Sequence, residues 1–93
     1  MQWFKKGDTI IRTGDTGEMF YIIMEGHVEC WQVIAREKSA TKERMVRKLT
    51  SGDHFGELAL INQNEVRTLT VRCGSDKAKL LALDRTSFNR ILG

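Results

Sequence analysis

The chain contains 93 residues, with 15 lysine and arginine residues against 12 aspartate and glutamate residues, and a net charge of +3. This length fits a single domain, because folded domains usually contain about 50 to 250 residues. The positive excess is small and spread evenly along the sequence, which argues against a nucleic-acid-binding protein, whose basic residues gather on one face.

The sequence also argues against a membrane protein and against a disulfide or zinc framework. No apolar run approaches the roughly 18 residues of a spanning helix, and no signal peptide is recognisable. Cys30 and Cys73 are far apart and form no C-x-x-C motif. Because both lie in strand-like runs, we expect buried, reduced thiols and a cytoplasmic protein.

Short apolar runs bounded by glycine fill the first third of the chain. Residues 5–8 and 14–17 carry turn residues, and the runs that follow them are rich in β-branched and aromatic residues. The runs expected to be strands are residues 9–12, 19–24 and 28–33. Strands separated by glycine turns at a spacing of about ten residues favour a sandwich or barrel.

The second half continues this pattern around a charged segment. Residues 36–44 are charged almost throughout and are predicted to form an exposed hairpin loop. The strands expected after this loop are residues 45–49, 69–73 and 79–83. Asp84 then fits a helix N-cap. The apolar stripe of that helix is expected to comprise Phe88, Ile91 and Leu92.

The segment from Phe55 to Thr68 carries a ligand-binding pattern. Gly56 allows a close approach of the backbone, and a one-turn helix is expected over residues 56–60. The unpaired amides at its start, together with the positive end of the helix dipole, attract a phosphate. These amides belong to Glu57, Leu58 and Ala59. Arg67 adds a cationic fork suited to the same phosphate, and the Glu57 carboxylate suits sugar hydroxyls. The set predicts a sugar-phosphate site.

This segment resembles the phosphate-binding cassette of the cyclic nucleotide-binding domain, with the pattern F-G-E-x-A-L, a short loop and P-R-x-x-T-V. The matching residues are Phe55, Gly56, Glu57, Ala59, Leu60, Arg67, Thr70 and Val71. Val66 replaces the family's proline, which softens the loop without removing a ligand contact. Further matches from Gly7 to Val28 and from Leu83 to Gly93 extend the resemblance over nearly the whole chain.

The resemblance implies a mainly β fold with short helices. We expect an eight-stranded antiparallel β-roll, or jelly-roll barrel, with a one-turn phosphate-binding helix and a truncated C-terminal helix. Residues 1–93 are expected to form one cyclic nucleotide-binding domain. Members of the family usually carry helices before the first strand and a lid helix after the last one. This sequence includes neither, which predicts a domain excised from a larger protein.

Two further residues are expected to select the nucleotide. Thr68 follows Arg67, where cGMP-dependent protein kinases carry threonine or serine and cAMP-binding relatives commonly carry alanine. Its hydroxyl can bond both a phosphate oxygen and the 2-amino group of guanine. Arg47 matches a strand arginine of the kinase family, and its fork suits the O6 and N7 acceptors of guanine. The alternative to a role in ligand binding is an ordinary strand threonine for Thr68 and a solvated strand arginine for Arg47.

The resemblance thus implies a cGMP-binding regulatory module that controls a linked kinase domain, in a cytoplasmic cGMP-dependent serine/threonine protein kinase. The predicted ligand-binding residues are Arg47, Gly56, Glu57, Leu58, Ala59, Arg67 and Thr68. No catalytic residue and no cofactor is expected. A cAMP-binding domain and a degenerate interaction domain are the alternatives, and the intact cassette residues argue against the second.

The residues do not favour a jelly-roll enzyme of the cupin kind. Such enzymes hold a metal with several closely spaced histidines. The two histidines, His27 and His54, lie apart and form no H-x-H motif, and both are expected in surface turns. No serine lies in a nucleophile-elbow sequence beside a histidine and an acid, so we expect neither an enzyme nor a metal site.

Overall fold

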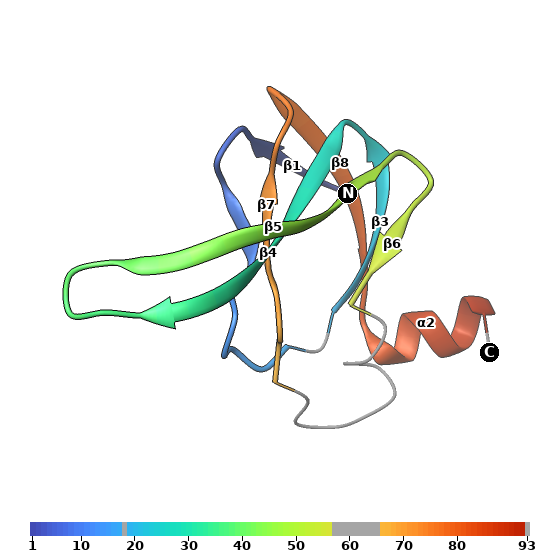
Figure 1. Cartoon of the computed structure of the whole chain (residues 1–93). Helices are drawn as coiled ribbons and strands as arrows, with labels where there is room; N and C mark the ends of the chain where they lie inside the picture. Colours follow the sequence, from blue (N-terminus) through green and yellow to red (C-terminus); the bar gives the residue numbers. More distant parts are fainter. Residues whose placement is uncertain (18, 57–65, 93) are drawn as a thin grey trace.

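The structure is a computed structural model that describes residues 1–17, 19–56 and 66–92. Within these residues eight strands and one helix follow one another along the chain (Figure 1). The elements are β1 (Gln2–Lys5), β2 (Thr9–Ile11), β3 (Phe20–Glu25), β4 (His27–Arg36), β5 (Thr41–Thr50), β6 (His54–Phe55), β7 (Thr70–Cys73), β8 (Lys77–Leu83) and α2 (Arg85–Leu92).

The strands form two four-stranded sheets that pack face to face. One sheet has the order β1-β8-β3-β6 and the other β2-β7-β4-β5, and every strand pair is antiparallel. Neighbours in the sheets are often distant in the sequence, as in the pairing of β1 with β8. The predicted eight-stranded antiparallel fold is confirmed.

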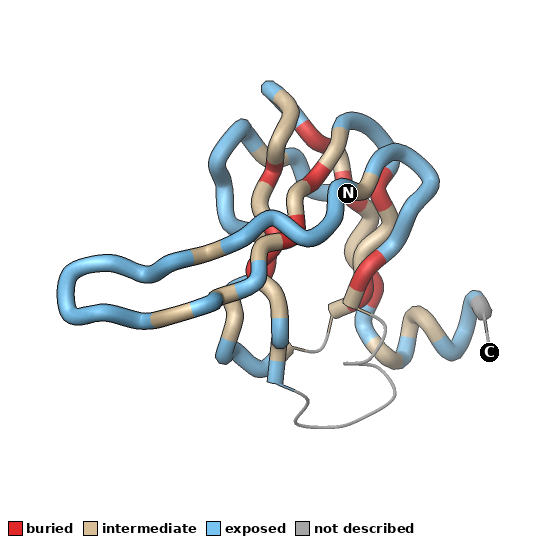
Figure 2. The backbone as a smooth tube through the Cα atoms, viewed as in Figure 1, coloured by how far each residue is buried: buried red, intermediate tan, exposed pale blue. Residues whose placement is uncertain are grey.

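Alternating side chains of both sheets build the larger of the two apolar clusters among the described residues, and Phe20 and Leu83 form the smaller one. The buried members of the larger cluster are Ile11, Ile23, Val28, Cys30, Phe55, Val71 and Leu80. Red segments in Figure 2 mark buried residues in strands of both sheets, so the core lies between them. The rings of Tyr21 and Phe55 stack at its margin, with centroids 5.1 Å apart. Cys30 and Cys73 are buried and free, as expected.

Residues 36–44 form an exposed hairpin as predicted, but the loop is shorter than predicted, because most of the segment is strand. β4 continues to Arg36 and β5 begins at Thr41, where these two residues are register partners. The turn between them is closed by backbone hydrogen bonds from Glu37 N to Ala40 O (2.8 Å) and from Ala40 N to Glu37 O (3.3 Å). Cross-strand backbone pairing therefore extends the hairpin through residues whose side chains are solvated.

The C-terminal helix begins as predicted. The Asp84 carboxylate accepts a hydrogen bond of 2.7 Å from the backbone N–H of Ser87, which makes Asp84 the N-cap of α2. Phe88 packs edge to face on Phe20, with ring centroids 5.3 Å apart. Ile91, however, is 63 % exposed, so the predicted apolar stripe does not hold at this residue.

The two histidines lie in strands and not in surface turns. His27 is the first residue of β4, and His54 is the first residue of β6. The prediction failed because polar residues beside glycine resemble turns, whereas cross-strand pairing starts directly after Gly26 and Asp53. Among the described residues no helix has the length and hydropathy of a membrane span.

Candidate functional site

A cavity of about 400 Å³ brings together four of the predicted site residues, Arg47, Gly56, Arg67 and Thr68. Apolar side chains that include Ile11, Leu49, Phe55 and Val71 form much of the remaining lining. An apolar wall with a few convergent polar groups, in a volume of about 300 to 1,000 Å³, is typical of small-molecule sites.

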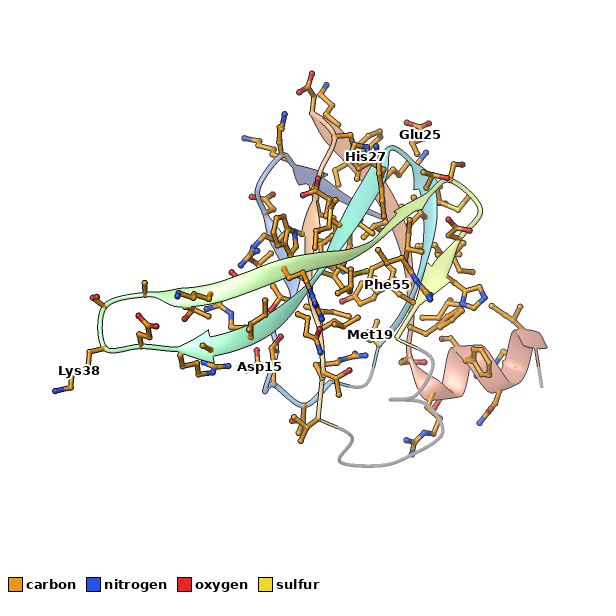
Figure 3. The ribbon with its side chains drawn as sticks, in the orientation of Figure 1. Asp15, Met19, Glu25, His27, Lys38 and Phe55 are labelled. Carbon is orange, nitrogen blue, oxygen red and sulfur yellow. The ribbon has the colours of Figure 1, made fainter. Side chains whose placement is uncertain are left out.

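The backbone around Arg67 is held by the turn that precedes β3. The Arg67 N–H donates to the carbonyl of Asp15 at 2.8 Å, and the Arg67 carbonyl accepts from Gly14 N–H at 2.9 Å. Thr16 and Val66 form an isolated antiparallel bridge beside these bonds. In Figure 3, Asp15 and Met19 lie at the lower end of the barrel, which is the end where Arg67 is anchored.

Backbone carbonyls orient the Arg67 guanidinium. Its Nη2 donates to the carbonyl of Met19 at 2.9 Å, and its Nη1 donates to the carbonyl of Gly56 at 3.5 Å. Burial lowers the pKa of Arg67, and the nearby Tyr21 acts in the opposite direction. A guanidinium has five N–H donors, so two carbonyls leave several donors for a ligand. Within the described residues no carboxylate pairs with Arg67.

Two glycines make room for this side chain. A Cβ added at Gly17 would lie 2.6 Å from Arg67 Nη2 and 2.8 Å from its Nε. A Cβ at Gly56 would lie 2.8 Å from the Met19 carbonyl and 3.0 Å from Arg67 Nη1, and Gly56 also has a φ of 91° that disfavours other residues. Gly56 was predicted as a site residue, and Gly17 was not.

Arg47 and Thr68 lie on the walls of the same cavity. Arg47 is an exposed residue of β5 and the register partner of the buried Cys30. Thr68 is exposed one residue after Arg67. Within the described chain neither side chain makes a hydrogen bond, and both line the cavity.

The remaining predicted residues fall outside the described part of the chain. Glu57, Leu58 and Ala59 belong to residues 57–65, as does most of the expected helix over residues 56–60. Their roles therefore remain predictions from the sequence.

Sequence reasoning missed several residues of the site. Gly17, Met19 and Asp15 act through backbone atoms or through the lack of a side chain, and the G-D-x-G turn gave only a general turn signal. His54 also lines the cavity, and its ring centroid lies 5.4 Å from that of Phe20. In the described ranges no group of three or more His, Cys, Asp and Glu residues is arranged to hold a metal ion.

The family model described as "Cyclic nucleotide-binding domain" matches residues 1–93. The cGMP-dependent protein kinase isozyme 1 of Drosophila melanogaster is 37 % identical over 93 residues, which are 100 % of this chain and 12 % of that protein. The cAMP-dependent protein kinase regulatory subunit of Schizosaccharomyces pombe is 41 % identical over 90 residues, 97 % of this chain and 19 % of that protein. The chain thus spans less than a fifth of these relatives.

Solved structures give the same fold. The regulatory domain of Toxoplasma gondii PKA, crystallised with cAMP, superposes with a TM-score of 0.83 and 36 % identity. The match covers 99 % of this chain and 33 % of that one. The catabolite activator protein of Thermus thermophilus superposes with a TM-score of 0.79 and 26 % identity, over 96 % of this chain and 39 % of that one.

Proposed function

The chain belongs to the cyclic nucleotide-binding domain family, and from this membership we propose that it binds cGMP as a regulatory module of a larger protein kinase. The observation that carries the proposal is the half-buried Arg67 at the cavity, whose guanidinium is oriented by the Met19 and Gly56 carbonyls. In this proposal a cyclic phosphate is the anionic partner of the guanidinium.

The phosphate and the ribose take different groups in this proposal. Arg67 donates to the exocyclic oxygens of the phosphate, in the charge-assisted geometry that guanidinium groups favour. The amides of Glu57, Leu58 and Ala59 complete the phosphate site, and the Glu57 carboxylate accepts a hydrogen bond from the ribose 2′-hydroxyl. The roles of Glu57, Leu58 and Ala59 rest on the sequence motif alone.

Guanine is proposed as the base because two polar residues of the cavity match its edge. The fork of Arg47 suits the adjacent O6 and N7 acceptors of guanine, whereas adenine presents an N6 donor at one of these positions. The Thr68 hydroxyl suits the guanine 2-amino group, which adenine lacks. The 37 % identity to a cGMP-dependent protein kinase agrees with this choice.

The second candidate ligand is cAMP. It is favoured by the 41 % identity to a cAMP-dependent protein kinase regulatory subunit and by the superposition on a PKA regulatory domain crystallised with cAMP. Arg67 and the cassette amides would serve either nucleotide equally, because both share the ribose and cyclic phosphate. The two ligands differ only at the base, and there Arg47 and Thr68 distinguish them.

In the proposed parent protein this domain has no catalytic role and controls a linked kinase domain in the cytoplasm. Nucleotide binding changes kinase activity only if the inhibited and active states bind the ligand with different affinities. The proposal therefore requires a conformational change coupled to the segment that contains the cassette.

Isothermal titration with cGMP and cAMP under identical conditions tests the choice of nucleotide. We expect cGMP to bind more tightly by at least tenfold, because Arg47 and Thr68 each contribute hydrogen bonds to guanine that adenine does not make. Tighter binding of cAMP would contradict the guanine assignment and leave cyclic nucleotide binding intact. Absence of binding by both would contradict the proposed function.

A further inference from the structure

The β4–β5 arm, defined here as residues 34–48, holds the positive charge of the molecule. Its basic residues are Arg36, Lys38, Lys42, Arg44, Arg47 and Lys48, and its acidic residues are Glu37 and Glu43, which gives a net charge of +4. The rest of the chain has nine basic and ten acidic residues, a net charge of −1. The charge is thus concentrated on one element, contrary to the even spread expected from the sequence.

The outer part of the arm stands clear of the barrel. Figure 1 shows the β4–β5 hairpin extending to the left of the two sheets, and Figure 3 shows Lys38 at its tip. In Figure 2 the projecting parts of β4 and β5 are exposed over most of their length. Apolar side chains share this exposure, because Ile34 is 59 % exposed and Met45 is 47 % exposed. The arm therefore presents accessible charge and accessible apolar surface together.

The acidic side chains of the arm are already opposed by cations. Glu37 Oε1 lies 3.6 Å from Lys42 Nζ. Glu43 accepts from Arg72 Nη2 at 2.8 and 3.0 Å, through its two carboxylate oxygens. Because Arg72 belongs to β7, the barrel itself neutralises Glu43 and fixes the base of the arm. The positive side chains therefore dominate the field around the arm.

The outer edge of β5 is open to another strand. β5 is the last strand in its sheet order, and within the described residues β4 is its only paired neighbour. A ten-residue edge presents backbone donors and acceptors that can pair with an extended chain. A second copy of β5 is disfavoured there, because its lysines and arginines would face those of the first copy. A chain of opposite charge has no such obstacle.

We propose that the outer edge of β5 is a docking site for an acidic, extended segment of another protein, which adds to the sheet as a further strand. Carboxylates of that segment pair with Lys42 and Arg44, and its backbone pairs with β5. Met45, exposed beside Arg44, offers the adjoining apolar contact. The cavity residue Arg47 lies nearer the barrel and is not required for this contact.

The probe is a fluorescent ten-residue peptide of alternating glutamate and valine, titrated with the whole chain and followed by anisotropy at low ionic strength. We expect saturable binding, weakened at least tenfold by the double variant Lys42→Glu, Arg44→Glu. The matched control is Lys5→Glu, Lys6→Glu, which makes the same change of charge on β1 and the following turn and should alter the affinity less than twofold. Circular dichroism confirms that each variant is folded.

A second peptide separates strand addition from simple charge attraction. The same sequence with N-methyl groups at alternate residues keeps every carboxylate but cannot pair its backbone, and we expect it to bind at least tenfold more weakly. Equal affinity for both peptides would overturn the proposal, as would equal affinity for the two double variants. Tighter binding of a ten-base-pair DNA duplex than of the acidic peptide would assign the arm to nucleic acid instead and would also overturn it.

Discussion

The guanidinium of Arg67 lies against Gly17 so closely that a Cβ on this glycine would be 2.6 Å from Nη2. Gly17 is thus part of the surface that holds Arg67, although it has no side chain. The backbone of Gly17 is outside the left-handed region. A larger residue at this position would therefore clash with the Arg67 side chain but would not strain the backbone.

Gly17→Ala is expected to weaken cyclic nucleotide binding while leaving the domain folded. The added methyl group displaces the tip of a flexible side chain, which costs little stability but moves the guanidinium from the Met19 carbonyl. We expect a loss of affinity of about tenfold, the value of roughly one hydrogen bond to a charged group. Isothermal titration and thermal denaturation measure the two effects separately.

Gly74→Ala provides the matched control for this variant. Its Cβ would also meet a side chain, 2.5 Å from His27 Nε2, and its φ is not in the left-handed region. His27 lies at the upper end of the barrel in Figure 3, away from Asp15 and Met19. We expect unchanged affinity in this variant. A comparable loss in both variants would mean that Gly17 acts only through general packing.

Thr68→Ala and Arg47→Ala are expected to reduce selectivity for cGMP. Each variant removes one or two hydrogen bonds to guanine and should weaken cGMP by roughly 1–2 kcal/mol. Affinity for cAMP should change little, because adenine does not use these groups. Parallel titrations with both nucleotides check this prediction, and an equal loss for cGMP and cAMP would place the two residues at the shared ribose phosphate.

Asp84→Ala is expected to destabilise α2, and the effect is expected to depend on pH. Hydrogen bonds from Ser87 lower the pKa of the Asp84 carboxyl below its usual value. A group with a lowered folded-state pKa stabilises the fold above its unfolded pKa, about 3.9, and loses that contribution as the pH falls through the folded value. The melting temperatures of the parent and the variant should therefore differ at pH 7 and converge in strong acid, whereas Asp84→Asn should retain much of the cap.

The thiol of Cys30 is expected to be unreactive in the folded protein. Burial raises the pKa of Cys30 above its usual value, and the side chain is 3 % exposed. The thiolate is the nucleophile, so alkylation by N-ethylmaleimide at pH 7 should be slow in the native state and fast in denaturant. Mass spectrometry of the labelled peptide gives the rate, and rapid native labelling would show that the cavity exposes this residue.

The barrel could be predicted from the sequence because its strands follow simple local signals. β2, β3, β7 and β8 carry alternating or continuous apolar residues between glycine turns, and the Asp84 cap marks the start of the helix. The hairpin arm could not be predicted in the same way. Its strand state depends on pairing between residues 36 and 41 and not on hydrophobic alternation, so its charged side chains resembled a loop.

Apart from Gly56, the residues of the cavity that could be predicted as ligand contacts are those whose side chains carry the chemistry. Arg47 is distant in the sequence from the adjacent residues Arg67 and Thr68, and the cavity brings the three together. The contacts that orient the Arg67 side chain were missed, because they come from the Met19 carbonyl and from the space above Gly17. The direction of a carbonyl and the space above a glycine depend on tertiary packing, so no residue type in the sequence predicts them.

The central claim is that Arg67 is the phosphate ligand of a cyclic nucleotide site. Isothermal titration of cGMP into the parent chain and into Arg67→Ala tests this claim most directly, with circular dichroism as the check on the fold. Removal of the cation leaves a desolvated phosphate without its partner, so we expect a loss of about 2–5 kcal/mol, or roughly 30- to 5,000-fold in affinity. A folded Arg67→Ala variant that binds cGMP within about tenfold of the parent chain would contradict the account.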